Sequence, residues 1–340
     1  MPSTPLAVDR QQILRFRRAT NGLGARVPRN ARTLRRAALA GLQDSMPRAA
    51  TLSLHARLDD VDPFAWDDPA FVQVWGPRYN AYVIPASDVA TFTLGRLPDD
   101  ERGRKRAFDT ARELRGLVGH RSMDLREASR SLGGHPSRLR YAATTGTVAI
   151  TWDGARQPTV RMLEPSDVDP SDARRELVKR YLHVFGPSTP EAFGAWAGIT
   201  KKSSVAAFDR LRRSMTPVAT PVGDEWIINE DVDRLRNTEG EDASVRLLPS
   251  GDAYFLLQGD ERRLLVPRTE RQSLLWTSRV WPGAILADGE IVGTWRRSAN
   301  LVSASMWGKV SRRLLSDIEA EAMSLPIPDV AGSMRIEFAG

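Results

Sequence analysis

The chain has 340 residues, which is enough for two or three domains, and its 41% apolar and 27% charged residues are typical of a globular protein. Cysteine is absent, which excludes disulfides, thiolate metal sites and a cysteine nucleophile, and the four histidines lack the spacing of a zinc site. No apolar run is long enough to cross a bilayer, and residues 1–18 do not form a secretory signal. We therefore expect a cytoplasmic, nucleoid-associated protein without a membrane partner.

The net charge of +7 and the pI near 10.1 favour a polyanionic partner, because Lys and Arg that neutralise phosphates release condensed counterions. Almost all of this positive charge is arginine, which GC-rich coding also produces, so local clustering is better evidence than the total. One such cluster precedes Gln43 and is opposed only by Asp9. Its members are Arg10, Arg15, Arg17, Arg18, Arg26, Arg29, Arg32, Arg35 and Arg36.

The first part of the chain predicts helices followed by a hairpin, the arrangement of a winged helix-turn-helix. Asp9 is a possible N-cap, and Asn21-Gly22 is a stop signal for the first helix. The expected helices cover residues 9–20, 31–42 and 51–58. Two β-rich runs, Phe71–Trp75 and Asn80–Pro85, then flank a Gly76-Pro77 turn and predict a hairpin.

The same order of elements occurs twice more without sequence identity at a fixed period. In the second unit we expect helices over 124–130 and 136–144 and a wing made of 148–152 and 159–163. In the third unit we expect helices over 174–185, 193–197 and 203–215 and a wing over 217–228 that folds at Gly223-Asp224. Between the first two of these helices, Ser188 and Glu191 have the spacing of a capping box. Helix-Gly-helix also joins ordinary core helices, but three such units in a basic chain favour nucleic-acid binding.

From about Val245 the pattern changes to short strands. The expected strands are 245–248, 253–257, 263–266, 284–287, 291–296, 303–306 and 334–338, with a helix over 309–323. Asp288-Gly289 is a hairpin signal. The sequence therefore predicts an α+β fold with about three tandem winged-helix units and a small C-terminal β-rich domain, with boundaries at 1–118, 119–170, 171–244 and 245–340.

Three polar side chains in a row, Gln43, Asp44 and Ser45, follow the apolar end of the predicted second helix. One interpretation is that Asp44 or Ser45 caps the next helix, as such residues often do before an apolar run. The other is that these side chains face a ligand. Local sequence alone leaves both open.

Seven blocks, in the right order over nearly the whole chain, resemble the winged-helix DNA glycosylases of the AlkZ/YcaQ-like family. The blocks are Gly41-Leu42-Gln43 with Pro47–Ala50; Trp75–Arg78; Tyr82–Asp88; Tyr181-Leu182 with Phe185–Thr189; Phe193–Gly198; Leu247–Pro249 with Asp252–Tyr254; and Asp288–Arg296.

This resemblance implies hydrolytic excision of bulky or cationic N-alkylated bases, such as N7-alkylpurines, from double-stranded DNA. The family carries a Gln-x-Gln or Gln-x-Asp pair on a concave basic surface. Gln43 matches the first Gln, whereas Ser45 stands at the second position and Asp44 at the middle one, which is apolar or small in the family. Either the site is rebuilt from Gln43, Asp44 and Ser45, or the chain is a winged-helix DNA binder that has lost catalysis.

The resemblance also implies a hairpin that probes the duplex, which we assign to Arg78 and Tyr79 at the first hairpin tip. Further phosphate contacts are expected from basic residues near the motif and on the candidate recognition helices, although a solvated surface charge is the commoner role for any one of them taken singly. These residues are Arg48, Arg138, Arg140, Lys201, Lys202 and Arg212. The chain is expected to act as a monomer and to need no metal and no cofactor.

Overall fold

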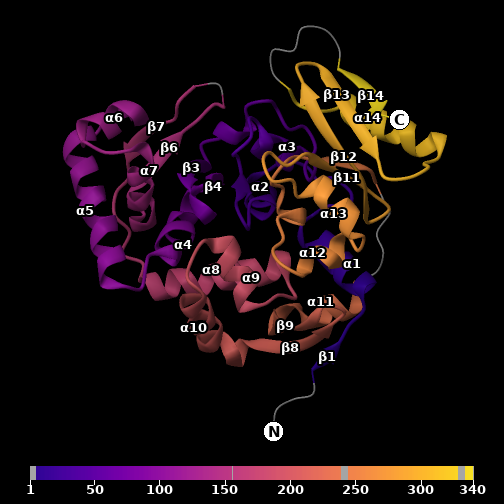
Figure 1. Ribbon diagram of the computed structural model, residues 1–340, viewed down its shortest axis with the longest axis horizontal. Helices are drawn as coiled ribbons and strands as arrows, with labels where there is room; N and C mark the ends of the chain where they lie inside the picture. The colour runs from indigo at the N-terminus through magenta and orange to yellow at the C-terminus, as the bar shows by residue number, and fades with distance from the viewer. Residues whose placement is uncertain (1–4, 155, 239–243, 328–333, 340) are drawn as a thin grey trace.

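The computed structural model describes residues 5–154, 156–238, 244–327 and 334–339, and it has a mixed α and β fold with three separate sheets (Figure 1). Within these residues, no helix has both the length and the apolar character needed to span a membrane. The predicted α+β class is confirmed. The domain boundaries stay a prediction.

The N-terminal part forms helices α1 (Arg10–Thr20), α2 (Ala31–Ala37) and α3 (Ala49–His55) and strands β2 (Leu42–Gln43), β3 (Phe71–Trp75) and β4 (Ala81–Pro85). Asp9 caps α1 as predicted, by accepting a hydrogen bond from the backbone N–H of Gln12.

The predicted second helix is too long, because α2 ends at Ala37 and residues 42–43 are a strand that pairs antiparallel with β4. The conformation of Gly41 explains why the chain does not continue as a helix into residues 42–43. Its φ of +72° is left-handed, and a Cβ at this position would lie 2.9 Å from the Tyr82 ring. The run of alanines and leucines before Gly41 has helical periodicity, but only part of it is helical.

The second unit extends the same sheet. Its elements are α4 (Val89–Thr93), α5 (Glu101–Val118), β5 (Ser122–Asp124), α6 (Leu125–Ser131), α7 (Pro136–Leu139), β6 (Val148–Thr151) and β7 (Thr159–Met162). The strand order is β2-β4-β3-β6-β7-β5, and the contact between the two hairpins is the pairing of Gln73 with Ile150. The first two predicted wings are therefore halves of one six-stranded sheet.

The third unit contains α8 (Pro170–Phe185), α9 (Pro190–Ala197), α10 (Lys201–Leu211), β8 (Met215–Thr220), β9 (Gly223–Ile228) and α11 (Val232–Asn237), and β1 (Leu6–Ala7) adds to its sheet in parallel with β8. The wing turns at residues 221–222 rather than at Gly223-Asp224. Thr189, not Ser188, caps α9, and Ser188 is instead buried against Tyr181 and Glu261.

The C-terminal domain is a five-stranded sheet of β10 (Arg246–Leu248), β11 (Gly283–Ala287), β12 (Glu290–Ser298), β13 (Leu301–Met306) and β14 (Arg335–Ala339), with helix α14 (Arg312–Met323) beside it (Figure 1). Two predicted strands are wrong. Residues 253–255 form a 3₁₀ turn capped by Asp252, and α12 (Glu261–Leu265) and α13 (Thr269–Leu275) are helical. Short apolar runs do not distinguish a strand from a buried helical turn.

Most of the arginine cluster before Gln43 is structural, which corrects the reading that only Asp9 opposes it. Carboxylates that are distant in sequence pair with these side chains, some within the N-terminal part and some from the C-terminal domain. The ion pairs are Arg10–Glu290, Arg17–Glu261, Arg26–Glu321, Arg29 with Asp62 and Asp68, and Arg35–Asp88. This cluster therefore joins the N-terminal segment to the rest of the protein.

Two carboxyl groups are buried together where α1, β9 and α12 meet. Arg17 pairs with Glu261, and Glu225 Oε2 is buried without a hydrogen-bond partner. Burial and repulsion from Glu261 raise the pKa of Glu225 to about 8, and burial raises the pKa of Glu261 to about 7.

Stability should therefore depend on the ionisation of Glu225. A carboxyl with a raised folded-state pKa holds its proton longer in the folded chain, so stability should fall as the pH rises from about 4.5 to about 8. We expect Glu225→Gln to flatten this decline and to be more stable than the wild type at pH 8, measured by urea unfolding at each pH. The exposed Glu230→Gln is the control, and an equal decline in all three proteins would contradict the assignment.

Candidate active site

Gln43 is held at the junction of the shared sheet and the C-terminal domain. Its partner across β2 and β4 is Tyr82, whose hydroxyl donates to Gln43 Oε1 at 3.3 Å, and Arg78 Nη2 donates to the same oxygen at 3.5 Å. Burial raises the pKa of Tyr82 to about 12, so its hydroxyl remains a neutral donor. The side chain of Gln43 is half-buried. Its carboxamide is thus oriented by one phenol and one guanidinium.

A loop of the C-terminal domain packs closely against the amide nitrogen of Gln43. Gly251 has a φ of +81°, and a Cβ built on it would lie 2.8 Å from Gln43 Nε2. The next residue, Asp252, is fully buried in a salt bridge of 2.7 Å with Arg57, and it also accepts a hydrogen bond from Ser53. A loop of the C-terminal domain therefore fixes where the Gln43 amide can lie.

Asp44 points away from this position. Its side chain is only 3% exposed, its Oδ1 accepts from the backbone N–H of Ala50 at 3.0 Å, and its Oδ2 accepts from Gln73 Nε2 at 2.9 Å. Successive side chains of an extended segment lie on opposite faces, so Asp44 and Gln43 cannot share a water. The interpretation of Asp44 as a helix-capping residue fits this geometry. Its part in catalysis stays a prediction.

Removing the Asp44 carboxylate should destabilise the protein rather than change its chemistry. Asp44→Ala leaves the Ala50 N–H and the Gln73 amide without acceptors in a buried place, which costs about 2–4 kcal/mol of unfolding free energy. Urea denaturation measures this loss. The exposed Asp167→Ala should show none, and an Asp44→Ala protein that keeps its full stability would contradict the capping role.

Ser45 lies in a different space from Gln43. Its Oγ is buried without a hydrogen-bond partner and lines a cavity of about 290 Å³ together with Tyr79, Arg140 and Trp152. Gln43 does not line this cavity. The structure therefore brings Ser45, Tyr79 and Arg140 together, but not Ser45 and Gln43.

The tip of the first hairpin is not a free projection, which corrects the expectation for Arg78 and Tyr79. Gly198, at the end of α9, packs so closely that a Cβ there would lie 3.0 Å from the Arg78 backbone nitrogen. The Tyr79 ring is half-buried, 5.8 Å from the Tyr141 ring and 5.0 Å from the Arg96 guanidinium. Arg78 thereby faces Gln43, and the Tyr79 ring packs against Tyr141 and Arg96.

The second hairpin covers the segment that follows Gln43. Gly154, in the connection between β6 and β7, packs so closely on Pro47 that a Cβ there would meet the Pro47 Cβ at 2.7 Å. Arg156 and Gln157 are exposed in the same connection. The sequence contains this hairpin but gives no sign that it reaches the motif.

One arginine, Arg78, contacts Gln43, and Arg262 lies near Arg78. Across the described residues, no ion pair involves Arg48, Arg78, Arg262 or Arg297. Burial and the charge of Arg78 lower the pKa of Arg262, and burial and the charge of Arg48 lower the pKa of Arg297. Each of these pairs is therefore close enough for like charges to interact, and Arg48 also lies close enough to Asp44 to be attracted by its carboxylate. Sequence reasoning missed Arg262.

Comparison with known proteins identifies the family. Residues 34–325 match a family model described as "DNA glycosylase AlkZ-like". The chain belongs to the AlkZ-like DNA glycosylase family. The resemblance drawn from the sequence blocks is thus confirmed.

A solved structure, the Streptomyces sahachiroi DNA glycosylase AlkZ, superimposes with a TM-score of 0.79 at 16% identity, covering 98% of this chain and all of that one. This match establishes the shared fold. An interstrand DNA cross-link repair glycosylase from the same organism is 22% identical over 157 residues, which is 45% of this chain and 42% of that protein. The chain thus aligns with less than half of this curated relative.

The remaining basic residues predicted for this AlkZ-like chain do not contact Gln43. Arg138 pairs with Glu113 at 2.6 Å, Lys201 pairs with Glu191 at 3.1 Å, and the Arg212 guanidinium lies 4.1 Å from the centre of the Trp226 ring. Lys202 is exposed at the start of α10. Their roles in DNA binding stay predictions. No cluster of three His, Asp or Glu residues suited to a metal occurs in the part of the chain that the structure describes.

Proposed function

We propose that the protein is a monofunctional DNA glycosylase that hydrolyses the N-glycosidic bond of bulky or cationic N-alkylated bases in duplex DNA. The observation that supports this most is the position of Gln43, whose carboxamide is oriented by Tyr82, Arg78 and Gly251. The enzyme acts as a monomer, without cofactor, on the DNA of the cytoplasmic nucleoid.

A carboxamide can carry this reaction because the substrate supplies its own activation. A base alkylated at a ring nitrogen is already cationic, so it leaves without a general acid. What remains is to hold a water beside the anomeric carbon as the sugar gains oxocarbenium character. Both hydrogen bonds to Gln43 Oε1 are long, 3.3 and 3.5 Å, so this oxygen can accept a hydrogen bond from a water at little cost.

The neighbouring arginines bind the DNA in this proposal. Guanidinium groups contact phosphates through paired N–H donors, and these contacts fix the register of the duplex. Arg78, which contacts Gln43, and Arg262, which lies near Arg78, form no ion pair among the described residues and suit the phosphates that flank a lesion.

A second function, a DNA binder without catalysis, is favoured by one observation. Ser45, which stands where the family has Gln or Asp, lines a separate cavity, so Gln43 has no second polar residue of the motif beside it. This protein would recognise lesions or regulate transcription through the same arginine surface.

Excision assays separate these two functions. Purified protein is incubated with duplexes that carry N7-methylguanine or a nitrogen-mustard adduct, and abasic sites are counted after alkaline cleavage. Release above the spontaneous rate supports the glycosylase. Binding to both duplexes without release would support the non-catalytic binder and contradict the proposal.

The arginine surface predicts a specific salt dependence. Because each phosphate contact releases about one counterion, Arg48→Gln and Arg297→Gln should each lower the slope of log K against log salt by about one. Duplex binding measured by fluorescence anisotropy across salt checks this. Arg313→Gln, which changes a highly exposed arginine on α14, is the control, and equal slopes for all four proteins would remove these arginines from the interface.

A further inference from the structure

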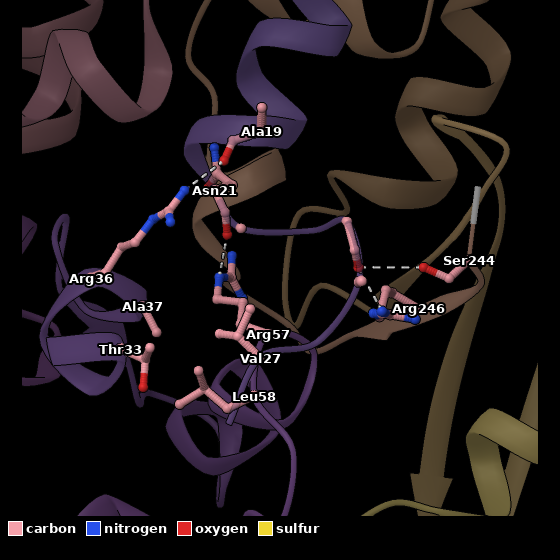
Figure 2. A pocket seen from close by; sticks show the side chains of 13 residues that line it. Ala19, Asn21, Val27, Thr33, Arg36, Ala37, Arg57, Leu58, Ser244 and Arg246 are labelled. Atoms are coloured by element: carbon pink, nitrogen blue, oxygen red, sulfur yellow. Dashed lines mark hydrogen bonds between the residues drawn. The ribbon is translucent and has the colours of Figure 1, made fainter. Parts of the chain in front are cut away.

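A cavity of about 550 Å³ lies away from Gln43, between the N-terminal helices and the start of the C-terminal domain (Figure 2). Its walls come from the end of α1, from α2, from the residues after α3 and from the first residue of β10. None of the residues proposed to act on the glycosidic bond lines it. Its volume lies within the range of about 300–1,000 Å³ that small-molecule sites occupy.

The lining of this cavity is positively charged. It contains Arg36, Arg57 and Arg246, and none of its lining residues is an Asp or a Glu. Arg57 is neutralised by Asp252. Arg246, by contrast, is 5% exposed and makes three hydrogen bonds, all to backbone carbonyl oxygens. Glu321 and Asp59 lie close enough to attract this guanidinium, but neither forms an ion pair with it, so its remaining N–H groups can still donate to an anion.

Arg36 provides a second cation at the rim. The side chain is exposed, and its one hydrogen bond, to the carbonyl of Ala19, is 3.5 Å long. Figure 2 shows Arg36 reaching across the cavity toward Asn21. So weak a contact leaves the guanidinium free to turn toward a ligand.

Asn21 adds an independent sign of a missing partner. It is only 6% exposed, and its Nδ2 donates to the carbonyls of Arg17 and Val184 at 2.8 and 2.9 Å, which fixes the orientation of the amide. Its Oδ1 is buried without any hydrogen-bond partner. An unsatisfied buried acceptor costs about 1–3 kcal/mol, so a hydroxyl or amine donor is needed here.

We propose that this cavity binds a phosphate-bearing ligand of nucleotide size. The phosphate oxygens accept hydrogen bonds from Arg36 and Arg246, and a sugar hydroxyl or a base amine donates to Asn21 Oδ1. A free nucleotide and a nucleotide of bound DNA share this chemistry.

Calorimetric titration of the DNA-free protein with deoxythymidine 5′-monophosphate tests the site. We expect saturable one-to-one binding that Arg36→Gln weakens about tenfold, the loss of one charge-assisted contact. Arg32→Gln, an exposed arginine on the same helix that does not line the cavity, is the matched control. Absence of saturation at millimolar nucleotide, or equal weakening by both variants, would overturn the proposal.

Two further measurements, a titration with inorganic phosphate and a competition with duplex DNA, test which ligand the cavity binds. Inorganic phosphate alone should bind more weakly than the nucleotide, because it has no sugar or base group that could donate to Asn21. Equal affinity for the two would overturn the Asn21 contact. If the nucleotide competes with duplex DNA, the site takes a phosphate of the DNA backbone; if both bind together, it takes a free nucleotide. The titration contains no lesion, so it measures nucleotide binding independently of base excision. The protein could excise bases without binding the nucleotide, or bind the nucleotide without excising bases.

Discussion

Gln43→Ala is expected to lower the rate of base excision by about 10²- to 10³-fold while leaving the affinity for duplex DNA nearly unchanged. The carboxamide is the one polar group that Tyr82, Arg78 and Gly251 together orient, so its removal takes away the group that positions the water. The affinity is provided by the arginines, which this variant keeps. Single-turnover excision and anisotropy titration measure the two effects separately.

Gly251→Ala provides a control that keeps the amide but moves it. The new methyl group would lie 2.8 Å from Gln43 Nε2, at the flexible end of that side chain, so the amide shifts. Alanine at a φ of +81° also strains the backbone by about 1–2 kcal/mol, so urea denaturation must show that the variant is folded in the excision assay. We expect a loss of excision in the same direction as for Gln43→Ala, with duplex affinity again retained. If both variants excise at the wild-type rate, Gln43 is not catalytic.

The sequence predicted the class of fold because its signals are local. Asp9 before an apolar helix, the Gly-Pro turn after Trp75 and the Asp-Gly pair at 288–289 each specify a cap or a turn within a few residues. The structure has elements at all three places. Predictions failed where an element depends on distant packing, as at Gly41, where the Tyr82 and Phe92 rings leave no room for a Cβ and the backbone has a left-handed φ.

The site could be predicted only in part for the same reason. Gln43 was found through the resemblance, but its orienting contacts come from residues far along the chain, and no local pattern places Gly251 against it. Asp44 stands beside Gln43 in sequence and on the other face in space. Charge was also misleading, because an arginine run looks the same whether its partners are phosphates or the protein's own carboxylates, as with Arg17 and Glu261.

The salt bridge between Arg57 and Asp252 predicts the largest effect on stability. Both side chains are almost completely buried, and they share two hydrogen bonds of 2.7 and 2.9 Å. Asp252→Ala leaves the Arg57 charge without a partner, which costs about 3–5 kcal/mol of unfolding free energy. Urea denaturation measures this loss, and Asp109→Ala, which removes an exposed carboxylate from its pairs with Lys105 and Arg112, should leave the midpoint unchanged.

A double variant tests whether the cost comes from the unpaired charge. Arg57→Met combined with Asp252→Ala removes both ionised groups, so it should recover part of the stability that Asp252→Ala loses. It cannot recover excision in the same way, because Asp252 also fixes the loop that presses Gly251 against Gln43. A folded double variant with slow excision is therefore the expected result. One that is both stable and fully active would show that the Gln43 amide is oriented by Tyr82 and Arg78 alone.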